Sequence, residues 1–332
     1  MSFSNILAQQ TAVWLFKKAL QEEKLAHAYL LTGPDGVGKR TLAKETAKGL
    51  NCRGDYPQLE TQNSELKTEV IWPCDRCREC RLIESDQYAD VMVLTPENKS
   101  LKIETIRRLQ RAVALKPYES HFRVAIIQDV DQLTPDAAHA FLKTLEEPPQ
   151  GVFFFLTTQY RERVFATIQS RCQVVFMKAI PKQILEQKMI PRPIISLAQG
   201  SFGRASYWMD PEIGERRKKI LSALFLNHPL DDINEKASSK EEERLLMEEK
   251  LLLLESGFRD LIVWKKTKEE SLLIHWDYRE HIKNFAPRFG INELEDKIIS
   301  LERLTQGLDR SANLKLTQAV LELELASLTK AE

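Results

Sequence analysis

Short apolar runs alternate with longer amphipathic segments in the first half of the chain. The apolar runs cover residues 28–32, 90–95, 123–127, 152–157 and 173–177. Short, nearly continuous apolar runs are typical of strands that are buried on both faces of a parallel sheet. The segments between them place apolar residues at helical spacing. The alternation therefore predicts an α/β domain, a parallel sheet with helices on both faces, over residues 1–178.

The pattern changes after residue 178. Residues 179–210 predict a small helical unit, in which only residues 191–193 separate two helical segments. From residue 211 the strand pattern is replaced by long segments that mix charged and apolar positions, as at 241–265, 291–308 and 314–328. Such segments are typical of long helices with a broad apolar side. We therefore predict an all-α domain over residues 211–332.

Length and charge agree with a multi-domain protein. The 332 residues suffice for two or three domains with separate cores. The 48 Lys and Arg balance the 48 Asp and Glu, so the chain as a whole is not an electrostatic nucleic-acid binder. We find neither a secretory segment nor an apolar run long enough to span a bilayer, so we expect a cytoplasmic protein without a membrane partner.

Residues 33–40, GPDGVGKR, come between an apolar run and a helical segment. The phosphate-binding pattern G-x-x-x-x-G-K-[ST] requires this context. Gly33, Gly36 and Gly38 would let backbone N–H groups face phosphate oxygens, with Lys39 beside the outer phosphates. The next position should carry a hydroxyl group for Mg²⁺ but is Arg40, and Thr41 lies further round the helix.

The second half of such a site is altered as well. After the run 123–127, Gln128 stands where a metal-holding aspartate is expected, and Asp129 stands where a water-activating glutamate is usual. An amide does not neutralise a cation as a carboxylate does. Because both magnesium contacts are changed, we predict no hydrolysis, and whether ATP binds stays open. The alternative is an active ATPase, in which Thr41 or water replaces the hydroxyl and Asp129 holds Mg²⁺.

Three cysteines have the spacing C-x-x-C-x-x-C, at Cys74, Cys77 and Cys80, and Cys52 is the fourth candidate ligand. Three thiolates on a tight knuckle, with a fourth from Cys52, suit tetrahedral Zn²⁺. The residues between them are charged, so the segment needs the metal for order. We predict a structural zinc knuckle over about residues 52–80, against the alternative of unligated cysteines. An autonomous zinc-containing DNA-binding protein is a further alternative, which the zero net charge disfavours.

A basic segment lies between two of the apolar runs. Ile106, Leu109 and Val113 have helical spacing and should face a core. This leaves Arg107, Arg108 and Arg111 on the outer face. Point charges of this kind suit contact with DNA phosphates. The alternative is a solvated helix face.

Further motifs follow in order along the chain. Residues 137–149 read AAHAFLKTLEEPP, the run 154–158 ends at Thr158, residues 170–172 read SRC, and residues 200–205 read GSFGRA. With the phosphate loop and the inserted cysteines, they resemble the AAA+ clamp-loader subunits of bacterial DNA polymerase III. Arg40 and Gln128 favour the delta-prime type over its ATP-hydrolysing sister subunit.

The resemblance implies an AAA+ phosphate-loop core with a zinc-knuckle insertion, a small helical lid and an all-α collar that assembles the loader. It implies nucleotide-sensing roles for Thr158 and Arg204, and makes Arg171 an arginine finger that reaches a neighbouring ATPase subunit. The implied partners are the ATPase subunits, a delta-type subunit, the sliding clamp and primed DNA. The implied function is to help load the clamp on primed DNA without hydrolysing ATP.

Overall fold

The computed structural model describes residues 3, 6–54, 73–97, 100–120, 122–226, 239–309 and 313–326. The chain divides into two compact units. The first consists of residues 1–185 and 200–203, and the second of residues 186–199 and 204–332. The domain boundaries predicted at residues 178 and 210 stay predictions.

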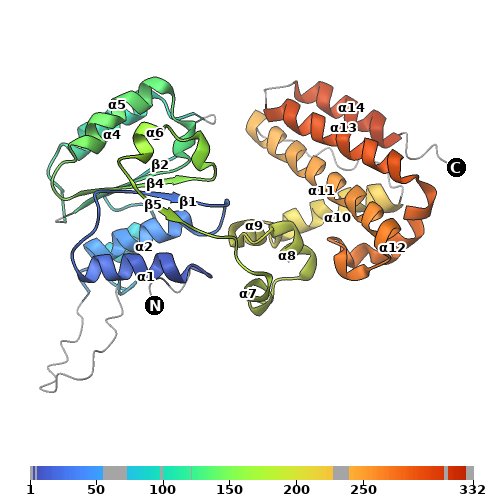
Figure 1. Ribbon diagram of the computed structural model, residues 1–332, viewed down its shortest axis with the longest axis horizontal. Helices are drawn as coiled ribbons and strands as arrows, with labels where there is room; N and C mark the ends of the chain where they lie inside the picture. The colour runs from blue at the N-terminus through green and yellow to red at the C-terminus, as the bar shows by residue number, and fades with distance from the viewer. Residues whose placement is uncertain are drawn as a thin grey trace, which may run out of the picture. The chain divides into compact units, whose positions relative to one another are not determined.

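The first unit is built on a parallel sheet of five strands in the order β2-β3-β4-β1-β5 (Figure 1). The strands are β1 (Ala28–Thr32), β2 (Val91–Leu94), β3 (Arg123–Ile127), β4 (Val152–Thr158) and β5 (Gln173–Phe176). Each of the five predicted strands is confirmed, within two residues at its ends. Every residue of β1 and β3 is buried, which explains why these runs lack the alternation of a half-exposed strand.

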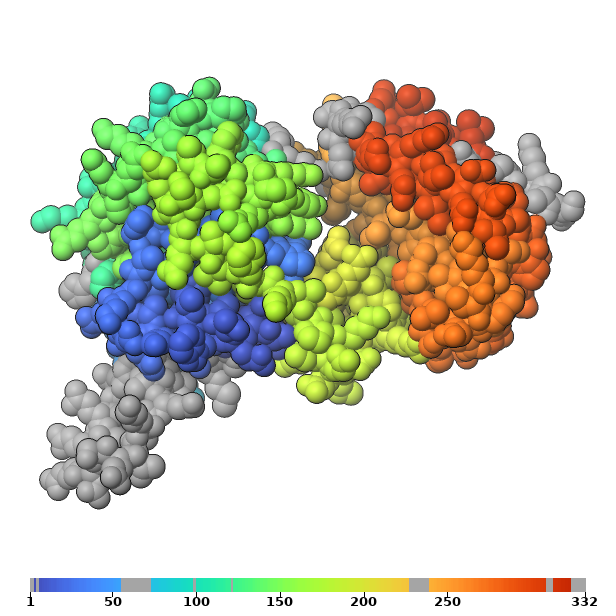
Figure 2. Space-filling view, viewed as in Figure 1, coloured from blue at the N-terminus to red at the C-terminus, as the bar shows by residue number. Residues whose placement is uncertain are grey.

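Helices cover both faces of this sheet, as the pattern predicts (Figure 1). On one face, α1 (Gln10–Gln21) and α2 (Lys39–Asn51) pack over Tyr29 and Leu31 of β1. On the other, α4 (Ile103–Val113) and α5 (Pro135–Glu146) pack over Ala28 and Leu30. Alternate residues of one strand thus enter two different cores. Figure 2 shows the outer surface of this unit, on which N-terminal residues (blue) and residues near 150 (green) lie next to each other.

The remaining elements of the first unit are short. They include α3 (Arg78–Glu84) and α6 (Ala166–Gln169). Helices α7 (Lys182–Gln187) and α9 (Phe202–Trp208) each have residues in both units. Because β1, β3 and β4 are parallel, the loops that follow them meet at one edge of the sheet. That edge brings residues 35–38 close to residues 128–129.

The second unit is helical in the residues described. Its helices are α8 (Arg192–Ala198), α10 (Pro211–Leu226), α11 (Lys240–Thr267), α12 (Arg279–Phe285), α13 (Ile291–Asp309) and α14 (Leu314–Ala326). The predicted helices over 241–265 and 291–308 are confirmed by α11 and α13. The third, 314–328, corresponds to α14, and its last two residues lie outside the described residues. Among the helices described, we find none with the length and apolar character that crossing a membrane requires.

Candidate functional site

A cavity of about 350 Å³ lies at the carboxyl edge of the sheet in the first unit. The phosphate loop lines one side of it through residues 35–41. Gln128 and Asp129, which follow β3, line another side, with Thr157 from β4 and Phe202 and Gly203 from the start of α9. The predicted loop, its lysine and the altered magnesium positions thus share one cavity.

Two glycines bring the backbone of residues 200–203 directly onto the phosphate loop. The Gly203 N–H donates to the Gly36 carbonyl oxygen over 3.0 Å. A Cβ on Gly203 would lie 2.9 Å from the Gly36 Cα, and one on Gly36 would lie 2.2 Å from the Ser201 Oγ. Gly36 also has a positive φ of 67°. Close approach therefore requires glycine at both positions, and at Gly36 the backbone conformation requires it as well.

The lysine of the loop makes its hydrogen bonds within the loop itself. Lys39 is only 7% exposed, and its Nζ donates to the carbonyl oxygens of Gly33 and Pro34, at 2.7 Å each. Burial lowers the pKa of Lys39, although the negative charges of nearby Asp35, Asp129 and Asp131 oppose that shift. In this conformation, the ammonium group offsets the negative charges of the nearby aspartates and donates hydrogen bonds to two carbonyl oxygens of the loop.

Arg40 stands at the position where a hydroxyl group would bind Mg²⁺, and its side chain forms an ion pair instead. The Arg40 Nη2 is paired with the Asp86 Oδ2, and the Lys44 Nζ reaches the other oxygen, Oδ1, of the same carboxylate over 2.7 Å. Thr41 lines the cavity. Burial raises the pKa of Asp129, and neighbouring Asp131 raises it further. An aspartate that is harder to ionise is a weaker cation ligand.

The two threonines at the end of β4 have different surroundings. Thr158, the predicted sensor, is fully buried, and its Oγ1 donates to the Asp131 Oδ1 over 2.6 Å. Thr157 lines the cavity instead, and its Oγ1 accepts the Asp129 N–H at 3.4 Å. Sequence reasoning did not select Thr157, although the alternation of side chains along a strand distinguishes neighbouring residues. Arg204 belongs to the second unit, where its Nη1 donates to the Gln199 Oε1 over 3.4 Å.

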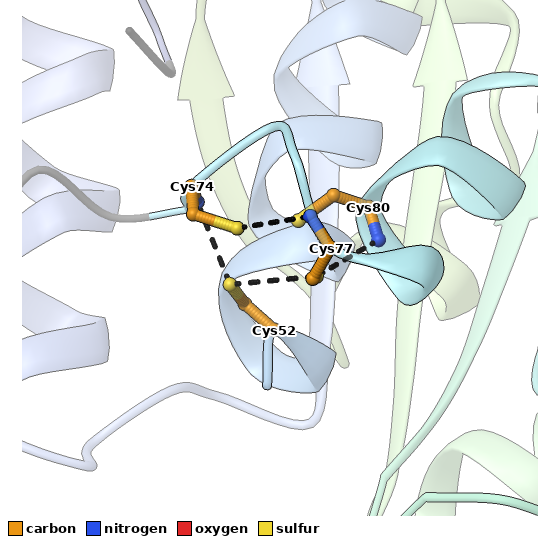
Figure 3. Close-up of side chains that lie close together, drawn as sticks. All are labelled: Cys52, Cys74, Cys77 and Cys80. Carbon is orange, nitrogen blue, oxygen red and sulfur yellow. Dashed lines mark hydrogen bonds between the residues drawn. The ribbon is translucent and has the colours of Figure 1, made fainter. Parts of the chain in front are cut away.

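The four cysteines meet in one cluster (Figure 3). Cys52 follows the end of α2, Cys74 and Cys77 lie on the turn before α3, and Cys80 is in α3. Their Sγ atoms all lie within 4.8 Å of one another, and those of Cys52 and Cys77 are 3.9 Å apart. Four Zn–S bonds of about 2.3 Å in a tetrahedron place sulfurs about 3.8 Å apart. The predicted grouping is therefore confirmed, and its geometry fits a zinc ion.

Backbone N–H groups point at these sulfur atoms. The Cys77 N–H donates to the Cys74 Sγ at 3.3 Å, and the Cys80 N–H donates to the Cys77 Sγ at 3.4 Å. The Cys74 N–H donates to the Cys52 Sγ at 3.4 Å. N–H groups aimed at sulfur favour its ionised form, which is the form that binds metal. Residues 55–72, inside the predicted knuckle range, lie outside the described residues.

Ion pairs attach this cysteine knuckle (Cys52 with residues 73–86) to α2. Lys48 is buried, and its Nζ lies 3.0 Å from the Asp75 Oδ1 and 2.7 Å from the Glu84 Oε2. It also lies 2.8 Å from the Glu45 Oε1. Burial alone would lower the pKa of Lys48, but its bonds to Glu45 and Glu84 outweigh burial and raise it. The helix that begins at the phosphate loop is thus held against the knuckle.

The arginines predicted to face partners lie on the surface of the first unit. Arg171 follows α6, and its Nη2 is paired with Glu146, while its Nη1 donates to the Thr167 carbonyl oxygen at 2.9 Å. On α4 the expected arrangement is confirmed, with Ile106, Leu109 and Val113 buried. Arg107, Arg108 and Arg111 are exposed. Their contact with DNA stays a prediction.

Comparison with known proteins identifies the family. A family model described as DNA polymerase III, delta subunit, matches residues 8–181. A second, described as DNA polymerase III, delta subunit, C terminal, matches residues 211–324. The chain belongs to the DNA polymerase III delta-subunit family. The resemblance inferred from the sequence motifs is thereby confirmed.

Individual relatives agree with this family. The chain is 29% identical over 228 residues to the DNA polymerase III subunit delta' of Bacillus subtilis, covering 66% of this chain and 65% of that one. It is 32% identical over 188 residues to the subunit tau/gamma of Haemophilus influenzae, covering 57% of this chain but 25% of that one. The chain thus spans less than two thirds of the length of these relatives.

A solved structure supports the fold. A gamma subunit-related protein of DNA polymerase III from Thermotoga maritima superposes with a TM-score of 0.51 at 15% identity. The superposition covers 87% of this chain and 98% of that one. At this identity the likeness concerns architecture alone. It agrees with the predicted AAA+ core and with the helical C-terminal region.

Proposed function

We propose that this chain is a non-hydrolysing, delta-prime-type subunit of the DNA polymerase III clamp loader. In this role it assembles with ATPase subunits and a delta-type subunit, and helps to place the sliding clamp on primed DNA in the cytoplasm. The family match and the similarity to a delta' subunit support the role. The observation that carries the non-hydrolysing part is the pairing of Arg40 with Asp86, at the position where a hydroxyl would hold Mg²⁺.

Several features of the cavity oppose hydrolysis together. Phosphoryl transfer depends on a metal ion that bridges the outer phosphates and neutralises the developing charge. Here Arg40 replaces the hydroxyl, and Gln128 replaces the metal-holding carboxylate. The acidic group that remains next to it, Asp129, has a raised pKa because it is buried. Binding of ATP without hydrolysis is compatible with this arrangement, and the proposed role does not depend on it.

A steady-state phosphate-release assay tests the non-hydrolysing role. The purified chain with ATP and Mg²⁺ should release phosphate no faster than its Lys39→Ala variant. Turnover by the unchanged chain that requires Mg²⁺ and disappears in Lys39→Ala would support the alternative of an active ATPase. The third possibility, an autonomous DNA-binding protein, predicts tight, salt-sensitive DNA binding by the isolated chain, which a titration over salt concentration measures.

We further propose that Arg171 acts on the nucleotide of a neighbouring subunit. The Arg171 side chain is 32% exposed, and its partner Glu146 is 49% exposed. Surface pairs of this kind contribute about 0–1 kcal/mol, so the guanidinium can be released to another anion without loss of fold. A guanidinium that reaches a transferring phosphate accelerates hydrolysis by about 10³–10⁵-fold in fingers of this kind.

The cysteine knuckle takes a structural zinc ion in this proposal. Cys52, Cys74, Cys77 and Cys80 would hold the ion through four sulfur atoms that lie within 4.8 Å of one another, and four such ligands would close its coordination sphere. A closed site stabilises local structure and has no open position for a substrate. When bound, the ion fixes the turn before α3 and the end of α2 to each other.

A further inference from the structure

The turn that follows helix α3 contains a residue in an unfavourable backbone conformation. Asp86 has a positive φ of 58°. The Gln87 N–H donates to the Leu82 carbonyl oxygen at 2.8 Å, and the Asp86 N–H donates to the Ile83 carbonyl oxygen at 3.2 Å. This pair of bonds defines a helix end at which glycine is strongly preferred. An aspartate there adopts a strained conformation, so we expect contacts of its side chain to stabilise it.

The carboxylate of Asp86 forms ion pairs with two basic side chains of α2. Its Oδ2 pairs with the Arg40 Nη2, and its Oδ1 lies 2.7 Å from the Lys44 Nζ. Arg40 and Lys44 are one helical turn apart, so a single carboxylate holds both. Lys44 has a second acceptor in the Glu84 carbonyl oxygen at 2.9 Å. Among the described residues, Asp86 is the one carboxylate paired with Arg40.

Arg40 stands beside the phosphate loop and lines its cavity. Its Nε is buried and has no acceptor among the described residues. The cavity already contains one ammonium, that of Lys39, facing the carboxylates of Asp35 and Asp129. Because two carboxylates face one ammonium group, the cavity disfavours the binding of an anion that brings no metal ion with it. A released guanidinium next to Lys39 would reverse the balance, since arginine pairs well with phosphate oxygens.

We propose that Asp86 is a positioning residue that engages the Arg40 guanidinium in an ion pair, and so prevents the phosphate loop from binding polyphosphates without magnesium. The cysteine knuckle thereby sets the ligand preference of a cavity located at the opposite end of α2. This inference builds on the proposed nucleotide-type cavity. Its test uses the isolated chain, so its failure leaves the clamp-loader role intact.

The experiment compares binding of inorganic tripolyphosphate and of ATP by isothermal titration calorimetry. The full chain is used without Mg²⁺ and without a chelator, which would remove zinc. Asparagine tolerates the conformation of residue 86 but carries no charge. Asp86→Asn should therefore keep the fold and bind both probes about tenfold more tightly than the unchanged chain, because one charge-assisted hydrogen bond is gained.

Two further variants separate positioning by Asp86 from a general change in charge. Glu84→Gln removes a negative charge from the same knuckle, but Glu84 pairs with Lys48 rather than Arg40, so affinity should stay unchanged. In the double variant Arg40→Ala with Asp86→Asn, the tenfold gain should disappear. A gain that survives removal of Arg40, or an equal gain in Glu84→Gln, would overturn the proposal.

A glycine variant controls for folding. Asp86→Gly suits the left-handed conformation, so the chain should melt at a similar temperature and keep its zinc content. It should show the same increase in tripolyphosphate affinity as Asp86→Asn. If neither variant binds tripolyphosphate or ATP more tightly than the unchanged chain, Arg40 is not restrained by Asp86 in the sense proposed.

Discussion

Asp90 should be one of the most sensitive positions in the first unit, because a whole loop is built on its carboxylate. The residue is fully buried, and it accepts N–H bonds from Tyr118 and Glu119 at 2.8 Å and from Ser120 at 3.2 Å. Arg123 pairs with it at 2.8 Å. The same guanidinium donates to the carbonyl oxygens of residues 115 and 116, at 3.1 Å each. The pair therefore fixes the connection between α4 and β3.

The expected loss in Asp90→Asn follows from these contacts. The amide keeps the volume but removes the charge that balances Arg123, which is 7% exposed. Breaking a buried ion pair on one side typically destabilises by about 3–5 kcal/mol. Even the lower value corresponds to an increase of about a hundredfold in the equilibrium constant for opening the loop. The matched control is Glu119→Gln, which removes the exposed pair with Arg78 and should change stability by at most about 1 kcal/mol.

Hydrogen exchange measured by mass spectrometry tests this prediction locally. Amides of residues 118–120 should exchange about a hundredfold faster in Asp90→Asn at neutral pH, whereas Glu119→Gln should leave them nearly unchanged. Equal protection in Asp90→Asn and the unchanged chain would refute the reasoning.

The same pair gives a pH dependence with a definite sign. Burial alone would raise the pKa of Asp90, but the N–H donors and Arg123 outweigh it and lower the pKa. The stabilisation is thus fully present above the unfolded pKa of about 3.9 and is lost as pH falls through the lower folded value. The unchanged chain and Asp90→Asn should therefore become similar in stability only below about pH 4.

Two further predictions concern the metal and the cavity. The purified chain should contain about one zinc per molecule, and Cys77→Ser should lose most of it, whereas Cys172→Ser, outside the cluster, should keep it; a zinc-free chain never exposed to chelator would contradict this. Arg40→Thr alone should not produce Mg²⁺-dependent phosphate release, because Gln128 still lacks the carboxylate; appreciable turnover in that variant would show that the hydroxyl was the one missing part.

The strands and the cysteine cluster were accessible from the sequence because their signals are local. A buried run such as 123–127 shows its structure in its own composition, and three cysteines at fixed spacing define most of a metal site. The family motifs added the order of the elements, and the family comparison confirmed the assignment.

The contacts that explain the site were not accessible, because they join distant segments. Arg40 and Asp86 are 46 residues apart, and no periodicity connects them. A carboxylate partner for Arg171 is a plain alternative to the arginine-finger role, but no local pattern identifies Glu146, 25 residues away, as that partner. Asp90 is a third example: it stands at the start of the predicted run 90–95, but its role in holding residues 118–120 depends on the tertiary fold. Such partnerships are decided by packing rather than by local propensity.

The proposal that Arg171 serves a neighbour while this chain's own cavity is inactive is tested most directly in a reconstituted clamp loader. DNA-stimulated ATP hydrolysis and clamp loading are measured with Arg171→Ala, Arg171→Lys and Lys39→Ala versions of this subunit. Arg171→Ala should assemble normally but lower both rates, Arg171→Lys should restore them poorly because lysine lacks the planar fork, and Lys39→Ala should have little effect. Loss of activity in Lys39→Ala equal to or greater than that in Arg171→Ala would contradict the account.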